Sequence, residues 1–207
     1  MAKYRIDYLK GHQDWKICQG HDMYHFNSDT CFLGEFIEIR NNDRVLDVGT
    51  NNGALLVYAG KKAKCKLYGL DINKKALKYA KKTMKINHLK ACFIHKDFSF
   101  YKNRKKFDTI IVNPPYFNSK DEKEKNANEN IKMARHEHFL TLESLFNSFN
   151  NNLKEDGQIF MVHRPSRLND IKKEIQKYDF TIETQKDIFN EKGKNITVLL
   201  KIVRRKK

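Results

Sequence analysis

The chain has 207 residues, of which 40% are hydrophobic, and its formal net charge is +16 with a pI near 9.6. This length suits one domain, residues 1–207, with a substantial core, and no apolar run reaches the roughly 18 residues of a membrane span. The charged first residues do not form a signal peptide, so we expect a cytoplasmic protein. The positive charge favours nucleic-acid partners, although an AT-rich genome would also produce the heavy use of lysine, asparagine and isoleucine.

Residues 1–27 show no helical period. They contain two alternating runs, at 4–8 and 14–18. This pattern predicts a hairpin that lies over the edge of the domain.

A strand, a glycine-containing turn and a helix are predicted over residues 44–48, 49–53 and 53–61. Gly49 and Gly53 would let backbone N–H groups approach a ligand at the carboxyl edge of a sheet, with the carboxylate of Asp47 beside the turn. A dinucleotide fingerprint has glycine where this chain has Asn51, which disfavours pyrophosphate binding. A plain strand-to-helix turn is the alternative interpretation.

The next predicted strand, residues 66–71, also ends in an acid. Asp71 lies about twenty residues beyond the glycines, where a carboxylate can accept two hydrogen bonds from ribose hydroxyls. Asn73 can cap a helix that extends to about residue 86, since apolar residues recur there at helical spacing.

A third strand, residues 92–95, leads to Asp97 and Phe98. The carboxylate can accept a hydrogen bond from an adenine amine, and the phenyl ring can cover the adenine face. Each aspartate alone could be a turn residue or a helix cap. Three acids at three successive strand ends instead predict one shared crevice at the edge of the sheet.

Residues 107–112 predict a short buried strand rich in β-branched residues. It ends in Asn113-Pro114-Pro115-Tyr116, where two prolines remove backbone donors and hold an extended turn. The motif fits either an ordinary strand-ending loop or a rigid polar clamp with an aromatic platform. The polar segment 118–134 that follows predicts a lid-like loop.

The rest of the chain continues the alternation. Helical periodicity and turn residues predict helices over 138–153 and 168–177, a turn at 155–157, a strand over 158–162 and an antiparallel pair over 180–184 and 195–203. The pattern as a whole predicts a doubly wound α/β fold. Its seven-stranded sheet would be mostly parallel, covered by helices on both faces, with a closing antiparallel strand.

Cysteine and histidine spacing disfavours metal sites. The four cysteines are far apart and form no CxxC pair, which predicts buried, reduced thiols rather than disulfides or zinc ligands: Cys18, Cys31, Cys65 and Cys92. The cluster Arg135-His136-Glu137-His138 does not match HExxH. No metal is expected.

From about residue 25 onwards these features resemble the class I S-adenosylmethionine-dependent methyltransferases, which have a Rossmann-like fold. In that fold the glycine turn holds the methionine part of the cofactor, the second-strand acid holds the ribose and the third-strand acid meets the adenine. The resemblance therefore implies S-adenosylmethionine as the cofactor. It assigns cofactor-binding roles to Asp47, Gly49, Asn51, Gly53, Asp71, Ile72, Asp97, Phe98 and Asn113.

The motif at 113–116 resembles the one that marks transferases acting on a planar amine, such as adenine N6, guanine N2 or a glutamine amide. The lone pair of such an amine is delocalised, so the amine is a poor nucleophile. The side-chain oxygen of Asn113 and the carbonyl of Pro114 can accept both amine hydrogens and direct the lone pair at the methyl group. Tyr116 can stack on a base flipped from its helix. Catalysis would then rest on positioning, with Asn113, Pro114, Pro115 and Tyr116 as the catalytic residues.

Four further segments, at 24–36, 134–146, 163–171 and 192–202, resemble the bacterial tRNA1(Val) (adenine-37-N6)-methyltransferase family. The resemblance implies a tRNA substrate methylated in the anticodon loop, and it places Asp29 and Thr30 near the cofactor carboxyl group. Phosphates of the tRNA would meet cationic side chains, for which the candidates are Arg135, Arg164, Arg204 and Arg205 beside Lys206 and Lys207. We expect a monomer.

Three alternatives stay open. The substrate could be an adenine or guanine amine of ribosomal RNA or DNA. It could also be a release-factor glutamine, although such enzymes carry an N-terminal helical substrate domain and only about 40 residues precede the strand at 44–48. A catalytically silent RNA-binding domain is the third alternative, and the intact acids and Asn-Pro-Pro-Tyr motif disfavour it.

Overall fold

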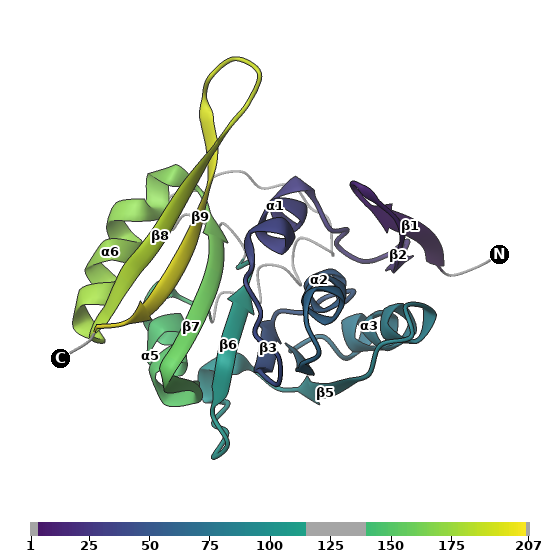
Figure 1. Ribbon diagram of the computed structural model, residues 1–207, viewed down its shortest axis with the longest axis horizontal. Helices are drawn as coiled ribbons and strands as arrows, with labels where there is room; N and C mark the ends of the chain where they lie inside the picture. The colour runs from purple at the N-terminus through teal and green to yellow at the C-terminus, as the bar shows by residue number, and fades with distance from the viewer. Residues whose placement is uncertain (1–3, 115–139, 206–207) are drawn as a thin grey trace.

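The computed structural model describes residues 4–114 and 140–205 and contains one large sheet and a separate hairpin (Figure 1). The large sheet consists of β3 (Arg44–Val48), β4 (Lys66–Asp71), β5 (Ala91–His95), β6 (Phe107–Val112), β7 (Leu153–His163), β8 (Phe180–Phe189) and β9 (Asn195–Arg204). Its order is β5-β4-β3-β6-β7-β9-β8. The strands from β3 to β7 are parallel, and β9 is antiparallel to both of its neighbours. The predicted fold class is confirmed.

The helices cover both faces of this sheet. They are α1 (Ser28–Phe36), α2 (Ala54–Lys62), α3 (Lys74–Ile86), α5 (Leu142–Asn152) and α6 (Leu168–Lys177), with 3-10 turns η1 (Phe98–Phe100) and η2 (Pro165–Arg167). Successive strand residues point to opposite faces: Ile110 packs with α5 and α6, whereas Ile111 packs with α1 and α2. Both cores are therefore built from the same strands, which explains their continuous apolar sequences.

The predicted N-terminal hairpin is confirmed. β1 (Tyr4–Leu9) and β2 (His12–Gly20) pair in antiparallel fashion and lie against α3. The backbone N–H of Cys18 donates to Thr83 Oγ1 at 3.0 Å, and Asn87 Nδ2 donates to the carbonyl of Lys16 at 2.6 Å. These side-chain bonds attach the hairpin to α3, which packs against β4 and β5 at that end of the sheet.

The structure differs from the sequence predictions at three elements. Helix α1 was not predicted; its Asn27 cap accepts the N–H of Thr30 at 3.1 Å, but its nine residues are too few for a clear period. The turn predicted at 155–157 is wrong, because these residues lie within β7 at a register irregularity against β6. Helix α5 begins at Leu142, after the cap Thr141; the earlier part of the predicted helix, at 138–139, and the proposed lid at 118–134 lie outside the described residues.

The four cysteines are free thiols. Cys18 and Cys31 are buried as predicted, whereas Cys65 is half-buried and Cys92 is exposed. Within residues 4–114 and 140–205 no cluster of three or more metal-binding side chains occurs, and the His136 and His138 cluster lies outside these ranges. Among the described helices, none has the length and apolar character needed to cross a membrane.

Candidate active site

The three acids predicted to share a crevice lie on adjacent strands. Asp47 is on β3, Asp71 ends β4, and Asp97 follows β5. β6, which leads into Asn113, is the other neighbour of β3. Because parallel strands end at one edge of a sheet, these side chains and Asn113 share the carboxyl edge of the sheet.

The loop after β3 has the backbone shape that its glycines predict. Gly49, Asn51 and Gly53 have positive φ angles of 68°, 48° and 81°. Asparagine tolerates this left-handed region better than most residues, so Asn51 substitutes for the second glycine of the usual fingerprint without breaking the turn. A Cβ atom on Gly49 would meet nothing within 4 Å. The loop is therefore open to a ligand on that side.

Asp71 holds this loop in place. Its carboxylate accepts the backbone N–H of Asn51 at 2.8 Å and that of Asn73 at 2.8 Å. Burial raises the pKa of Asp71, and the two N–H groups oppose that rise. The next residue, Ile72, is 47% exposed, and its carbonyl lies 2.9 Å from His95 Nε2. An acidic and an apolar side chain thus stand together at the end of β4, as expected for a ribose and an adjoining base.

Asp47 is buried beneath the loop. Its Oδ2 accepts the hydroxyl of Thr50 at 2.6 Å, while Oδ1 has no hydrogen-bond partner among the described residues. Burial raises the pKa of Asp47 from its ordinary value of 3.8 to about 7. A buried carboxylate oxygen without a partner usually has a functional reason, and a cationic ligand group would satisfy it.

Asp97 and Phe98 are placed differently from each other. Asp97 caps η1, accepting the N–H of Ser99 at 2.8 Å. Phe98 is only 2% exposed and packs against Phe149 in the core. Its ring therefore stabilises the fold, and an adenine contact through this ring stays a prediction. Phe100, on the same turn, is 83% exposed and was missed by sequence reasoning.

Asn113 is positioned by helix α1. Its Nδ2 donates to Thr30 Oγ1 at 3.1 Å, and Thr30 is in turn held by the cap Asn27. Asp29 is buried and accepts the hydroxyl of Thr197 at 2.6 Å. Thr30 is therefore in direct contact with the motif residue Asn113, and the placement of Asp29 and Thr30 near the cofactor carboxyl group stays a prediction. Pro114 follows Asn113, whereas Pro115 and Tyr116 lie outside the described residues.

The arginines predicted to contact RNA are engaged within the protein. Arg164 forms an ion pair with Asp29 at 3.5 Å and donates to the carbonyl of Ile196 at 3.0 Å. Arg204, whose side chain is 13% exposed, donates to Asn150 Oδ1 at 2.8 Å. Arg205 donates to the carbonyl of Phe180 at 3.2 Å, and Arg135 lies outside the described residues. Phosphate contacts through these arginines stay predictions.

Tyr24 is a second residue that sequence reasoning missed. Its carbonyl accepts Asn51 Nδ2 at 2.7 Å, and its side chain is 72% exposed. Gln19 of β2 is buried, and its Oε1 accepts Asn52 Nδ2 at 2.9 Å. The hairpin and the segment after it therefore support the glycine loop. Nothing local in the sequence signals this, because Tyr24 and Gln19 precede their partners in the loop by 27 and 33 positions.

These residues fit the cofactor that the sequence resemblance implies. S-adenosylmethionine carries a cationic sulfonium and an ammonium group, and the site offers three carboxylates, one of which has an oxygen with no hydrogen-bond partner in the described part of the chain. The space beside Gly49 lets a ligand approach the backbone closely. Asp71 and the exposed Ile72 stand where a nucleoside would be held.

Comparisons with known proteins agree with this geometry. The family model described as the methyltransferase small domain matches residues 23–187. A provisionally named protein N5-glutamine methyltransferase of Methanocaldococcus jannaschii is 38% identical over 92 residues, which are 44% of this chain and 46% of that protein. The tRNA1(Val) (adenine(37)-N6)-methyltransferase of Bacteroides thetaiotaomicron is 27% identical over 170 residues, covering 80% and 70% of the two chains. The chain therefore spans only about half the length of the first of these relatives.

The fold has counterparts among solved structures. One is the Pyrococcus abyssi tRNA (uracil-54, C5)-methyltransferase in complex with S-adenosyl-L-homocysteine, which is 18% identical with a TM-score of 0.67. The similarity covers 98% of this chain and 44% of that one. At this identity the likeness concerns the fold alone.

Proposed function

We propose that this chain, which belongs to the methyltransferase small domain family, transfers a methyl group from S-adenosylmethionine to the exocyclic N6 amine of an adenine in tRNA. The similarity to the Bacteroides enzyme over 80% of the chain supports this substrate, with A37 of the anticodon loop as the target. We further propose that the protein acts in the cytoplasm as a monomer.

When bound, S-adenosylmethionine supplies an electrophilic methyl group. The residues proposed to hold it are Asp47 and the Gly49–Gly53 loop for the amino-acid part, Asp71 with Ile72 for the ribose, and Asp97 for the adenine. The raised pKa of Asp47 places its titration near neutrality. A cationic ammonium group beside the unpaired oxygen would favour the ionised carboxylate and lower this pKa on binding.

The observation that carries the proposal is the placement of Asn113. Its amide nitrogen donates to Thr30 Oγ1 at 3.1 Å, so the acceptor role toward a substrate amine falls on Oδ1. Asn113 and the carbonyl of Pro114 would accept the two amine hydrogens and turn the nitrogen lone pair toward the methyl group. No strong base is needed, because the product proton can leave after transfer. The chain's contribution is positioning of the amine.

A second candidate substrate is a glutamine amide of a protein. The 38% identity to the Methanocaldococcus protein favours it, because that protein is provisionally named a glutamine methyltransferase. A glutamine amide is also a planar amine with a delocalised lone pair, so the same clamp would serve it. Adenine is preferred here because the similarity to the tRNA enzyme extends over nearly twice as many residues.

The proposal is tested with purified protein, S-adenosylmethionine and unmodified bulk tRNA, followed by nucleoside mass spectrometry after digestion. New N6-methyladenosine would support it, and fragment mapping would then identify the tRNA and the position. If the cofactor binds but no methylated nucleoside forms, the adenine-in-tRNA assignment is wrong. Parallel incubations with ribosomal RNA, DNA and release factors would show which planar amine is the substrate.

A further inference from the structure

Positive charge is concentrated in one segment of the chain. Residues 61–106 contain 16 of the 41 Lys and Arg residues but only 2 of the 25 acids, and those two are Asp71 and Asp97 of the candidate active site. The rest of the chain contains 25 basic and 23 acidic residues and is nearly neutral. A genome-wide bias toward lysine codons would not remove acids from one segment alone. The asymmetry therefore calls for a local explanation.

The fold gathers this segment on one side of the molecule. It comprises the end of α2, then β4, α3, β5 and η1, and the two strands form one edge of the large sheet (Figure 1). β8 and β9 lie at the opposite edge, and the predicted RNA contacts Arg204 and Arg205 are at the end of β9. The basic segment 61–106 thus forms one positively charged side of the structure, here called the flank.

Helix α3 arranges its lysines in a stripe. Lys74, Lys78, Lys81 and Lys85 recur at intervals of four, three and four residues, so they lie on one face of the helix. All four are exposed, as is Lys90 at the start of the turn into β5. At 1.5 Å per residue the stripe is about 16 Å long, which is comparable with several phosphates of a nucleic-acid strand. It begins three residues after Asp71, at the edge that holds the active site.

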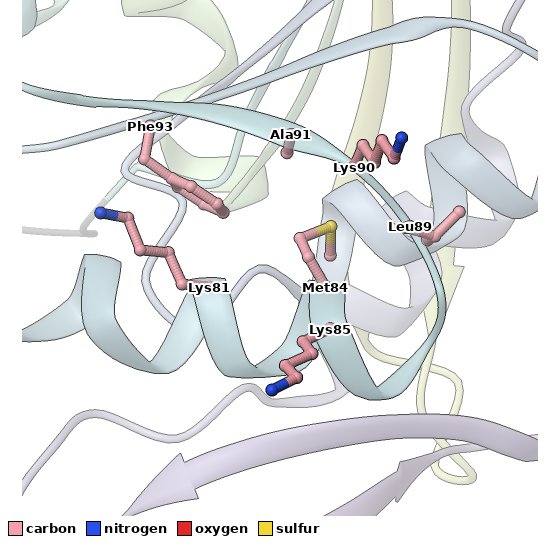
Figure 2. A pocket seen from close by; sticks show the side chains of 7 residues that line it. All are labelled: Lys81, Met84, Lys85, Leu89, Lys90, Ala91 and Phe93. Carbon is pink, nitrogen blue, oxygen red and sulfur yellow. The ribbon is translucent and has the colours of Figure 1, made fainter.

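An open groove runs beside the far end of this stripe (Figure 2). Lys81, Lys85 and Lys90 stand around it, and Met84 and Phe93 point into the space between α3 and β5. An apolar floor supports the hydrocarbon stems of lysines and leaves their ammonium groups at the surface.

The lysines of the stripe have no acidic partners among the described residues. A few lysines elsewhere do have such partners: Lys154 pairs with Asp108 at 2.6 Å and Lys177 with Glu174 at 2.8 Å. On α3 itself, only Lys75, outside the stripe, forms an ion pair, with Asp22 of the hairpin side. Unpaired ammonium groups in a row favour a polyanion over a solvated ion-pair network.

We propose that Lys74, Lys78, Lys81, Lys85 and Lys90, here called the α3 stripe, bind the sugar–phosphate backbone of the tRNA outside the target nucleotide. The inference rests on the proposed function, because it assumes an RNA substrate. Binding along the stripe releases counterions from the phosphates, so the affinity depends on salt and little on sequence. The stripe anchors the tRNA body while the target base reaches Asn113 at the same edge of the sheet.

The test compares two double variants with the same change in charge. Lys81→Gln/Lys85→Gln alters the stripe, and Lys172→Gln/Lys173→Gln alters two exposed lysines of α6 at the other side of the sheet. Glutamine retains helix propensity, and thermal unfolding with a cofactor titration checks that both variants are folded. Binding of unmodified bulk tRNA is then measured as a function of salt concentration.

We expect the stripe variant to bind tRNA about tenfold more weakly and to lower the salt slope of log affinity by about 1 to 2, with the α6 variant close to wild type. Equal effects of the two variants would overturn the stripe as a site while leaving an RNA-binding enzyme intact. Absence of tRNA binding by the wild type would overturn both the stripe and the proposed substrate. If the stripe variant loses binding only to vesicles of anionic phospholipid, while its binding of tRNA is unchanged, the flank is a membrane surface and the proposal is also overturned.

Discussion

Asp47 has a buried carboxylate, and within residues 4–114 and 140–205 just one of its two oxygens has a hydrogen-bond partner. Sequence reasoning placed it beside the cofactor turn but gave no reason to expect full burial. Its environment favours the neutral acid, which is why its pKa rises to about 7. A charge held in this position is a cost to the unliganded fold that a bound cation would offset.

The replacement Asp47→Asn tests this cost. Because the pKa is higher in the folded than in the unfolded protein, the stabilisation from protonation is complete below about pH 4 and is lost as the pH rises through about 7. The neutral amide removes this loss, so we expect the variant to gain stability relative to wild type between pH 5 and pH 8, by at most about 4 kcal/mol. Urea unfolding at pH 5 and pH 8 measures the free energy of unfolding of both proteins. If the difference between variant and wild type is the same at the two pH values, Asp47 does not have a raised pKa in the folded protein.

Asn113 and Asp71 are predicted to serve different molecules, so their variants should fail in opposite ways. Asn113→Ala removes the amine acceptor and is expected to abolish methyl transfer while cofactor affinity stays within a few-fold of wild type. Asp71→Ala removes a charged acceptor at the ribose position and should weaken cofactor binding by about 10- to 100-fold.

Calorimetric titration of S-adenosylhomocysteine and single-turnover transfer separate these two effects. Asp71→Asn serves as the more conservative comparison, because it retains the side-chain shape and one oxygen, which can accept the N–H of either Asn51 or Asn73. Loss of cofactor binding in Asn113→Ala would mean that this residue serves the cofactor. Unchanged affinity in Asp71→Ala would refute the ribose assignment.

At the scale of elements, helix α1 links β9 to the active site. Thr197 of β9 donates to the buried Asp29 at 2.6 Å, and the neighbouring Thr30 accepts from Asn113 at 3.1 Å. The three bonded segments are far apart in the sequence, so the helix brings together the first and last parts of the fold. A short helix with this role needs fixed ends, and Asn27 supplies the first one.

Thr197→Val is therefore expected to destabilise the protein by about 1 to 3 kcal/mol, because it leaves a buried carboxylate oxygen without its donor. The shape of the side chain is retained, so lost packing is a small part of the effect. Urea unfolding measures the change, with Thr184→Val on the exposed part of β8 as the matched control. Equal stabilities of the two variants would show that the link to Asp29 is energetically unimportant.

Element prediction succeeded where a local pattern decides the structure. The strands Arg44–Val48, Lys66–Asp71 and Phe107–Val112 and the helix Leu168–Lys177 have the predicted bounds. It failed at 155–157, where a Glu-Asp-Gly sequence suggests a turn but the residues lie within β7, between its pairs with β6 at Leu153 and Gln158. Tertiary pairing overrides local preference at such positions.

At the scale of the whole molecule, His163 makes the free energy of unfolding depend on pH in the acidic range. It ends β7, and its Nδ1 accepts the N–H of Arg164 at 2.9 Å. Burial, followed by the charges of Arg167 and Arg164, lowers its pKa from 6.5 to about 4. The unfolded chain therefore binds a proton in a range where the folded protein does not.

The global free energy of unfolding should reflect this difference. For a histidine whose pKa is lowered on folding, stability is retained above about pH 6.5 and falls as the pH drops toward 4. We expect His163→Asn, which keeps an acceptor for Arg164, to lose less stability than wild type over this interval, by up to about 3 kcal/mol. Urea unfolding from pH 7 to pH 4 gives both curves; parallel curves would exclude His163 as the titrating group.

The residue pattern was sufficient for the class of fold and for most of the candidate site. Alternating strands and helices imply a parallel sheet, and acids that follow consecutive strands must meet at its carboxyl edge. The sequence alone thus predicted one shared edge for Asp47, Asp71, Asp97 and Asn113, since backbone geometry brings the ends of parallel strands together. The overall positive charge also follows directly from the composition.

Long-range packing decided the remaining features. The bond from Asn113 to Thr30 joins residues 83 positions apart, and that from Thr197 to Asp29 joins residues 168 apart. The burial of Phe98, the internal bonds of Arg204 and the gathering of lysines on one flank likewise depend on which strands lie at the sheet edges. Strand order and helix docking are set by the packing of the whole core, so a side chain's neighbours and exposure cannot be obtained from local period or composition.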